Sequence, residues 1–302
     1  MNFDLTDEQR LLRETVRDFA RSEVAPVAEE LDRTKAFPYE IVQKMADLDL
    51  MGIPFPEQYG GGGGDILSYA LAVEELARID SSVAITMAAH ISLGTTPIYN
   101  WGSDEQKEEW MPVLTSAKKL AAFGLTEPEA GSDAGNTKTR AVLDGDEWVI
   151  NGAKQFITNS GTDISGCVSI TAVTGVDARG RAEISNFIVP NGTPGYTVEK
   201  PYRKMGWNAS DTHPLSFDDV RLPESAMLGP RGHGFKQFLQ ILDGGRIGVA
   251  AMAVGVAQGA LDESIKYAKE RQAFGKSISK FQSIQAKIAD ISSALEAARL
   301  LT

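Results

Sequence analysis

Apolar residues recur at helical spacing through the first third of the chain. Residues 6–9 have the Thr-x-x-Gln form of a capping box, and Leu12, Val16 and Phe19 follow at intervals of three or four residues. The same spacing predicts further helices over residues 41–48, 67–79 and 103–114, the last with a second capping box. Five consecutive glycines at 60–64 are flanked by helical segments rather than by a strand and a helix, so we predict a flexible connection and no phosphate loop.

The pattern changes in the middle third to short apolar runs separated by turn residues. Asp144-Gly145 and Asn151-Gly152 are both hairpin signals, because such pairs adopt the positive φ angles that tight turns require. The expected strands cover residues 141–143, 148–150, 155–158, 167–173, 184–189, 196–199 and 215–220. Their spacing favours an antiparallel sandwich or barrel over alternating β-α units.

Helical spacing returns after Gly234. Residues 235–269 are rich in alanine, valine and glycine, whose small side chains suit close helix packing, and a second helix is expected from about Phe281. The sequence stops at Thr302 in an apolar stretch with no glycine cap, so we expect it to be C-terminally incomplete. We predict an α+β fold with an N-terminal α-helical domain (1–118), a middle antiparallel β domain (119–232) and the truncated start of a C-terminal helical bundle (233–302).

Composition narrows the class of protein. The 302 residues, 42% hydrophobic and 24% charged, suffice for roughly two or three globular domains. Cys167 is the single cysteine, which excludes an intramolecular disulfide and a cysteine-built metal cluster, and the three histidines are too scattered for a helical metal site. The first eight residues lack a signal-peptide pattern, and the longest apolar run, 247–257, is shorter than the about 20 residues needed to cross a bilayer. We predict a cytoplasmic protein with no metal and no membrane partner.

The charge of −11 disfavours nucleic acid as a partner, because phosphate binding needs a basic surface. The charge is also uneven. Residues 1–118 carry 10 basic and 21 acidic side chains, residues 119–232 carry 11 and 14, and residues 233–302 carry 9 and 6. An anionic ligand is therefore expected to interact most favourably with the C-terminal third.

Four segments occur in a fixed order along the chain: LTEPEAGSDAG at 125–135, FITN at 156–159, DGGR at 243–246 and ERQAFGK at 270–276. Together they resemble the acyl-CoA dehydrogenase family from Leu5 to the last residue, and they are most similar to its short-chain, butyryl-type branch. The resemblance implies FAD-dependent α,β-dehydrogenation of a short- to medium-chain acyl-CoA to the trans-2-enoyl-CoA. It also implies electron transfer to an electron-transfer flavoprotein and, for the full-length chain, a homotetramer or dimer of dimers.

Several residues match the family's flavin contacts. An isoalloxazine ring needs hydrogen bonds along its polar edge and an aromatic wall. Phe156 and Thr158, two apart on a predicted strand, share one face and offer a ring and a hydroxyl near flavin N5. The alternative is a core phenylalanine and a surface threonine. By resemblance, Phe123, Leu125 and Thr126 lie along one side of the ring, and Arg271, Phe274 and Gln282 reach the FAD of a neighbouring subunit.

A second set matches the family's contacts to the acyl-CoA. By resemblance, Ser132 touches the acyl-CoA and Ser185 its pantetheine or phosphate portion. Asp243 and Arg246, three residues apart, share a helix face. They form either an intrahelical ion pair or polar contacts to CoA.

The family's catalytic base is a glutamate, found at one of two positions. One position immediately precedes the arginine of DGGR and is occupied here by Gly245. The other lies in a Tyr-Glu-Gly-Thr-like segment, which we expect C-terminal to Thr302. Glu127 and Glu129 match neither position, so no catalytic residue is assigned within 1–302. An acyl-CoA oxidase that uses oxygen, and a non-catalytic or nucleic-acid-associated member of the same fold family, remain as alternatives.

Overall fold

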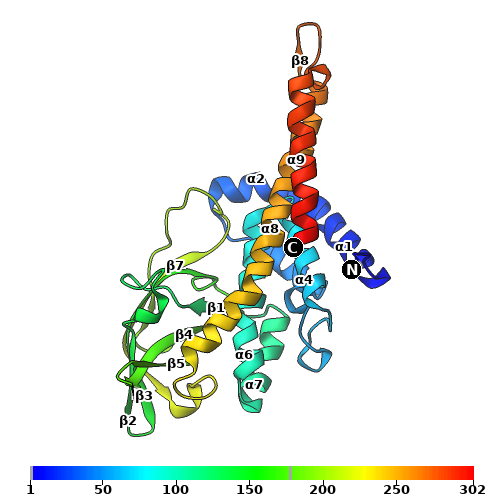
Figure 1. The fold of residues 1–302 in the computed structure, drawn as a ribbon. Helices are drawn as coiled ribbons and strands as arrows, with labels where there is room; N and C mark the ends of the chain where they lie inside the picture. The colour runs from blue at the N-terminus through cyan, green and yellow to red at the C-terminus, as the bar shows by residue number, and fades with distance from the viewer. Residues whose placement is uncertain (1–2, 177–178) are drawn as a thin grey trace.

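The computed structural model describes residues 3–176 and 179–302, which form two helical regions with a β-sheet between them (Figure 1). The N-terminal helices and the sheet lie side by side, and the long helix α8 (Gly234–Glu270) runs past both. Beyond the body of the molecule, α8 and α9 (Gln282–Leu301) form a projecting hairpin. The α+β fold with this order of regions is confirmed.

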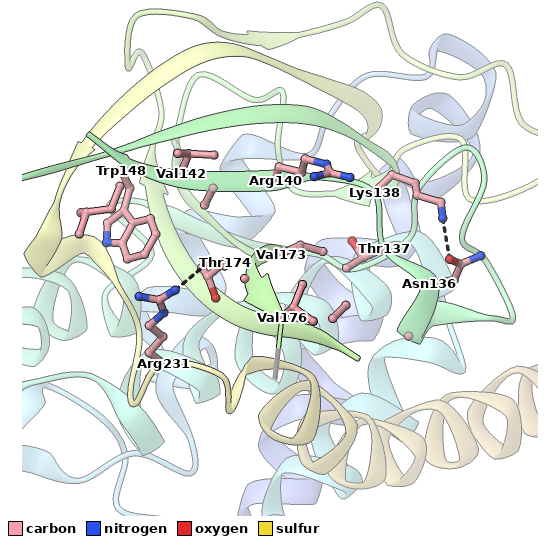
Figure 2. Close-up of a pocket in the computed structure, with 15 residues that line it drawn as sticks. Asn136, Thr137, Lys138, Arg140, Val142, Trp148, Val173, Thr174, Val176 and Arg231 are labelled. Atoms are coloured by element: carbon pink, nitrogen blue, oxygen red, sulfur yellow. Dashed lines mark hydrogen bonds between the residues drawn. The ribbon is translucent and has the colours of Figure 1, made fainter. Parts of the chain in front are cut away.

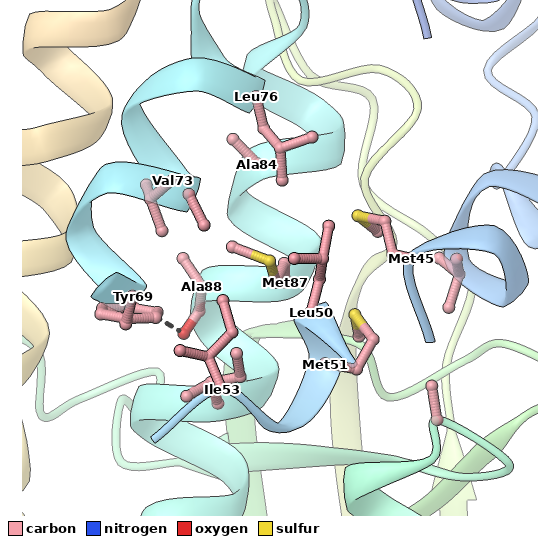
Figure 3. Packing of buried hydrophobic residues seen from close by; sticks show 14 of the residues in the cluster. Met45, Leu50, Met51, Ile53, Tyr69, Val73, Leu76, Ala84, Met87 and Ala88 are labelled. Carbon is pink, nitrogen blue, oxygen red and sulfur yellow. Dashed lines mark hydrogen bonds between the residues drawn. The ribbon is translucent and has the colours of Figure 1, made fainter. Parts of the chain in front are cut away.

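Capping and burial explain the N-terminal helices. Both predicted capping boxes are present: Thr6 and Ser103 each accept a backbone N–H from a glutamine three residues on, whose side chain bonds back. Apolar faces of the helices meet in one core, part of which appears in Figure 3 around Leu50, Tyr69 and Met87. The α-helices of this region are α1 (Asp7–Phe19), α2 (Ala25–Thr34), α3 (Tyr39–Asp47), α4 (Ile66–Ala77), α5 (Ser81–Ala88), α6 (Thr96–Trp101) and α7 (Asp104–Thr115).

Two π-helical turns, η1 (Ala20–Val24) and η4 (Ala89–Thr95), continue α1 and α5. Short 3-10 turns, η2 (Leu50–Gly52) and η3 (Glu57–Tyr59), precede the glycine run. The run is a connection, as predicted, but it is closely packed. A Cβ on Gly61 would lie 2.2 Å from the Phe55 carbonyl oxygen, so this close approach requires glycine.

The middle region is a seven-stranded sheet within the described residues. Its strands are β1 (Leu120–Gly124), β2 (Arg140–Asp144), β3 (Glu147–Thr158), β4 (Ser165–Val176), β5 (Ala182–Pro190), β6 (Tyr196–Val198) and β7 (Thr212–Pro223). The order is β1-β4-β2-β3-β7-β6, with β5 on β4. Most pairs are antiparallel, but β1 runs parallel to β4, and β2 meets β4 in one parallel pair. The sheet is therefore mixed rather than antiparallel as predicted. The difference arises because β1, which was not predicted, joins β4 in a parallel pair across a long connection. Short 3-10 turns flank the sheet segments at η5 (Ala134–Asn136) and η6 (Glu224–Ala226).

The predicted turn at Asn151-Gly152 is wrong. Both residues lie inside β3, where the register against β7 shifts between Ile150 and Gly152. Gly152 has φ +153°, and a Cβ there would lie 2.5 Å from Thr139 Oγ1. A β-bulge makes the same demand for glycine as a turn, which explains the error. A second shift between Lys154 and Ile157 places Phe156 at φ +61°.

Small residues let α8 approach α4, as predicted. A Cβ on Gly255 would lie 2.2 Å from the Glu74 carbonyl oxygen. At the far end of the hairpin, β8 (Gln272–Ala273), β9 (Lys276–Ser277) and η7 (Ile278–Lys280) connect α8 to α9. Arg299 on α9 returns to the body through a 2.8 Å ion pair with Glu74. Among the described residues, α8 alone is long and apolar enough to cross a membrane by length and composition, a test that core helices also pass.

Candidate active site

The ends of β1 and β3 bring two of the predicted flavin-contact segments together. The backbone N–H of Gln155 donates to the Thr126 carbonyl oxygen at 2.8 Å, which joins the segment after β1 to β3. Leu125 is buried, and Phe123 stacks on Phe238 of α8 with ring centroids 4.0 Å apart. The site thus has a fixed frame on its sheet side.

Phe156 presents an open aromatic face. Its side chain is 60% exposed, and its ring lies against Tyr202 with centroids 4.9 Å apart. It is therefore not a core residue, which removes that alternative. Ile157 is buried while Thr158 is half-buried, as strand alternation requires.

The residues around Phe156 fit a flavin. Within the described part of the chain, the half-buried hydroxyls of Thr126 and Thr158 make no hydrogen bond to another protein group. Neither hydroxyl oxygen is buried, so both are accessible to a ligand and can donate or accept a hydrogen bond with it. Two free hydroxyls beside an exposed ring match what an isoalloxazine requires, an aromatic wall and hydrogen-bonding groups at its polar edge.

A buried ion pair underlies this surface, and sequence reasoning missed it. Lys154 Nζ lies 2.7 Å from Glu127 Oε1, and the two side chains are 0% and 2% exposed. Glu127 also accepts from the Thr137 hydroxyl and from the backbone N–H groups of Lys138 and Thr139. The available signal was a lysine in strand register with Trp148 and Ile150, whose side chains face the core.

The environment shifts both pKa values of this pair. Burial lowers the pKa of Lys154 to about 8, against the opposing attraction of Glu127. Burial also opposes ionisation of Glu127, but the Lys154 charge and the hydrogen-bond donors outweigh it and lower the Glu127 pKa to about 2. Glu127 is thus a poor proton acceptor at neutral pH, in agreement with the absence of a base assignment there.

An apolar cavity of about 260 Å³ lies between α8 and the α5–η4 segment. Its lining consists of Tyr69, Ile85, Ala88, Ala89, Ser92, Leu93, Leu242, Gly245, Arg246 and Val249. A Cβ on Gly245 would lie 3.1 Å from Leu93 Cδ2, so the missing side chain leaves room for the cavity. The first of the two family base positions is therefore part of an apolar wall.

Asp243 and Arg246 form the intrahelical ion pair considered above, at 2.5 Å. Their side chains are 71% and 72% exposed, so solvent screens the pair and it contributes little to stability. Arg246 also lines the apolar cavity. The guanidinium is thus accessible to a ligand, and a role in CoA binding remains a prediction.

The two predicted serine contacts lie in different environments. Ser132 is exposed in the loop before η5. Ser185 is 0% exposed, with its hydroxyl 2.8 Å from Thr174 Oγ1 and accepting from the Gly232 N–H at 2.9 Å. A contact between Ser185 and a ligand stays a prediction, and it requires these neighbours to give way.

A groove of about 430 Å³ runs along β2 and β4 (Figure 2). Lys138, Arg140 and Arg231 give its lining a basic character, and Arg231 donates to the Thr174 carbonyl oxygen at 2.7 Å. Sequence reasoning named none of these residues. Lys138 and Arg140 belong to one segment, but Arg231 lies far along the chain before α8, and only folding brings it to them.

Arg271 and Phe274 belong to the connection between α8 and α9, and Gln282 begins α9. Figure 1 shows this connection, labelled β8, at the projecting end of the hairpin and away from the sheet. Phe274 is 93% exposed and contacts Phe281 edge-on, with ring centroids 6.0 Å apart. Arg271 is exposed and forms no ion pair within the described residues. One chain therefore does not bring this set to Phe156.

Three domain models of one protein family together match nearly the whole chain. Acyl-CoA dehydrogenase, N-terminal domain, matches residues 6–118; the middle domain matches 122–220 and the C-terminal domain 232–302. A probable acyl-CoA dehydrogenase of Bacillus subtilis is 53% identical over 299 residues, covering 99% of this chain and 78% of that protein. The short-chain specific acyl-CoA dehydrogenase of Clostridium acetobutylicum is 46% identical over 301 residues, covering 100% and 79%. The chain belongs to the acyl-CoA dehydrogenase family, so the assignment made from the four motifs is confirmed.

Solved structures agree with this. Butyryl-CoA dehydrogenase from Megasphaera elsdenii superposes with a TM-score of 0.94 at 44% identity, covering 99% of this chain and 78% of that one. A structure reported as the electron transferring flavoprotein of Acidaminococcus fermentans gives 0.95 at 44% identity, covering 100% and 78%. A glutaryl-CoA dehydrogenase from Mycobacterium smegmatis in complex with FADH2 gives 0.92 at 34%, covering 98% and 74%.

Proposed function

We propose that this protein is an FAD-dependent dehydrogenase of short- to medium-chain acyl-CoA thioesters. Family membership supports the reaction class. The observation that carries the cofactor assignment is the open face of Phe156 beside the free hydroxyls of Thr126 and Thr158. FAD, when bound, supplies the two-electron acceptor for oxidation of the Cα–Cβ bond.

The chain's own residues have separable roles in this proposal. Phe156 provides the aromatic wall, and Thr126 and Thr158 hydrogen-bond to the polar edge of the flavin. The cavity beside Gly245 excludes water from the acyl chain, and its modest size supports a short chain. Arg246, with Asp243, binds the CoA portion. We propose that the proton on Cα goes to a glutamate outside residues 1–302, because Gly245 occupies the position on α8 and Glu127 is committed to Lys154.

The electron acceptor and the assembly are further parts of the proposal. The structure named for an electron transferring flavoprotein supports such a partner. The hairpin end supports an oligomer, since Arg271, Phe274 and Gln282 are exposed there and contact no flavin-facing residue of the same chain. An acyl-CoA oxidase is the alternative, and the lifetime of the reduced flavin in air separates the two.

The principal test is flavin bleaching with a series of saturated acyl-CoA esters of increasing length. We expect rapid bleaching with butyryl-CoA and a decline for long chains. A purified protein that takes up no FAD refutes the proposal. Stopped-flow measurement on the 302-residue chain, beside any longer polypeptide that contains it, tests the base assignment. Rapid flavin reduction by the 302-residue chain alone would show that a carboxylate within it is the base.

A further inference from the structure

The Lys154 ammonium connects both segments that form the proposed flavin surface. It donates to Glu127 Oε1 at 2.7 Å, to Thr171 Oγ1 at 3.0 Å and to the Leu125 carbonyl oxygen at 3.4 Å. Leu125 and Glu127 flank Thr126, while Lys154 lies two residues before Phe156. One buried side chain therefore spans from β3 to the segment after β1.

The stem of Lys154 also fixes the spacing of the two segments. A Cβ on Gly124 would lie 3.3 Å from Lys154 Cγ, so the lysine packs directly over the glycine at the end of β1. The backbone bond from Gln155 to Thr126 adds a second connection one residue further along. Together these contacts determine how far Thr126 lies from Phe156.

Burial of the pair is costly in itself. Removing one partner of a buried pair leaves an uncompensated charge, whereas replacing both by apolar groups of similar volume is often neutral. Apolar packing is non-directional, but hydrogen bonds hold specific atoms at specific distances. The Lys154–Glu127 pair can therefore hold the segment around Thr126 at a fixed distance from β3, which apolar side chains cannot do.

We propose that Lys154, through Glu127 and the Leu125 carbonyl, is a positioning residue that sets the geometry of the flavin-binding surface. This inference rests on the proposed function, because it concerns the same cofactor site. Lys154 does not touch the flavin. Its effect reaches the ring through Thr126 and Phe156, which it holds in register.

The experiment compares four variants of the complete gene product: Lys154→Met, Glu127→Gln, the double variant and Lys118→Met. Lys118 is an exposed lysine whose side chain makes no hydrogen bond or ion pair within the described residues, so it controls for loss of a positive charge. The readouts are the melting temperature, the FAD dissociation constant of the apoprotein and the visible circular dichroism of bound flavin. The last two report on flavin geometry and do not follow from stability alone.

We expect each single change in the pair to lower the melting temperature, and the double variant to recover most of it because no charge is left unpaired. The double variant should still bind FAD on the order of 10- to 100-fold more weakly, with altered visible circular dichroism. Lys118→Met should match the wild type in every readout. A double variant with wild-type affinity and circular dichroism would overturn the inference and leave the pair a structural one. Wild-type protein that binds no FAD would overturn the proposed function as well.

Discussion

His90 makes folding stability depend on pH in a defined direction. The ring is completely buried in η4, the segment that lines one side of the apolar cavity. Its Nε2–H donates to the Leu114 carbonyl oxygen at 2.9 Å, and its Nδ1 accepts from the Ala121 N–H at 3.1 Å. Only the neutral ring with its proton on Nε2 satisfies both contacts. His90 thus connects the cavity wall to α7 and to β1.

The size of the effect follows from the pKa of His90. Burial lowers this pKa from 6.5 to about 4, although the hydrogen bond to Leu114 opposes the shift. Between these two values the unfolded chain binds more protons than the folded one, so the free energy of unfolding falls as the pH falls. The difference between the two pKa values corresponds to about 3 kcal/mol of unfolding free energy. About 2 kcal/mol of this stability is lost between pH 7 and pH 5.

The assay is urea unfolding at pH 7 and pH 5 for the wild type and His90→Gln. The glutamine does not titrate, so subtracting its pH dependence cancels the contributions of the carboxylates that both proteins share. We expect the variant to be less stable at pH 7, because a glutamine does not reproduce the ring geometry that bonds Leu114 and Ala121 together, but to lose about 2 kcal/mol less on acidification.

His213 is expected to change folding stability with pH in the direction opposite to His90. Its Nδ1 and Nε2 lie 2.6 Å from the Glu199 carbonyl oxygen and from Asp211 Oδ1, two acceptors that require a protonated ring. Burial opposes the charge, but the hydrogen bonds to Asp211 and Glu199 raise the His213 pKa above 6.5. Its stabilising contribution is therefore complete at low pH and is lost as the pH rises through the raised value.

If wild type and His90→Gln lose equal stability on acidification, the reasoning on His90 is refuted.

Three further predictions concern the ligands. If Arg271 reaches the FAD pyrophosphate of a neighbouring subunit, as the resemblance implies, Arg271→Ala removes a charge-assisted contact and should weaken FAD retention more than Phe156→Leu; equal flavin content in both purified variants would contradict this. Arg246→Ala should lower kcat/KM for acyl-CoA by roughly 10- to 150-fold with little change in FAD content, as expected for loss of a hydrogen bond to a charged group. Unfolding of this variant with normal kinetics of the surviving fraction would instead support the ion-pair role. Gly245→Leu should fill the cavity, since even a Cβ there approaches Leu93 Cδ2 to 3.1 Å, and should reduce turnover of longer acyl-CoA esters more than that of propionyl-CoA; an unchanged chain-length profile would place the acyl chain elsewhere.

Local signals in the sequence determined helices α1, α3, α4 and α7, whereas α2, α5 and α6 were not predicted. A capping box acts within four residues, and an apolar stripe identifies the face that will be buried, so Thr6 and Ser103 were placed correctly. The small residues of α8 likewise predicted its close packing, seen at Gly255. The four ordered motifs identified the family, because each is a short contiguous segment.

Only the tertiary structure decided the features that join distant segments. Asn151-Gly152 satisfies a bulge as well as a turn, and the choice depends on the pairing of β3 with β7 some 60 residues later. The parallel pairing of β1 with β4 was invisible for the same reason. The sequence assigned no role to Glu127, and only the folded structure shows its carboxylate 2.7 Å from Lys154 Nζ. The separation of Phe156 from Arg271 also follows from the length and direction of α8. Contacts of this kind depend on where the chain returns in space, which the residue types alone do not specify.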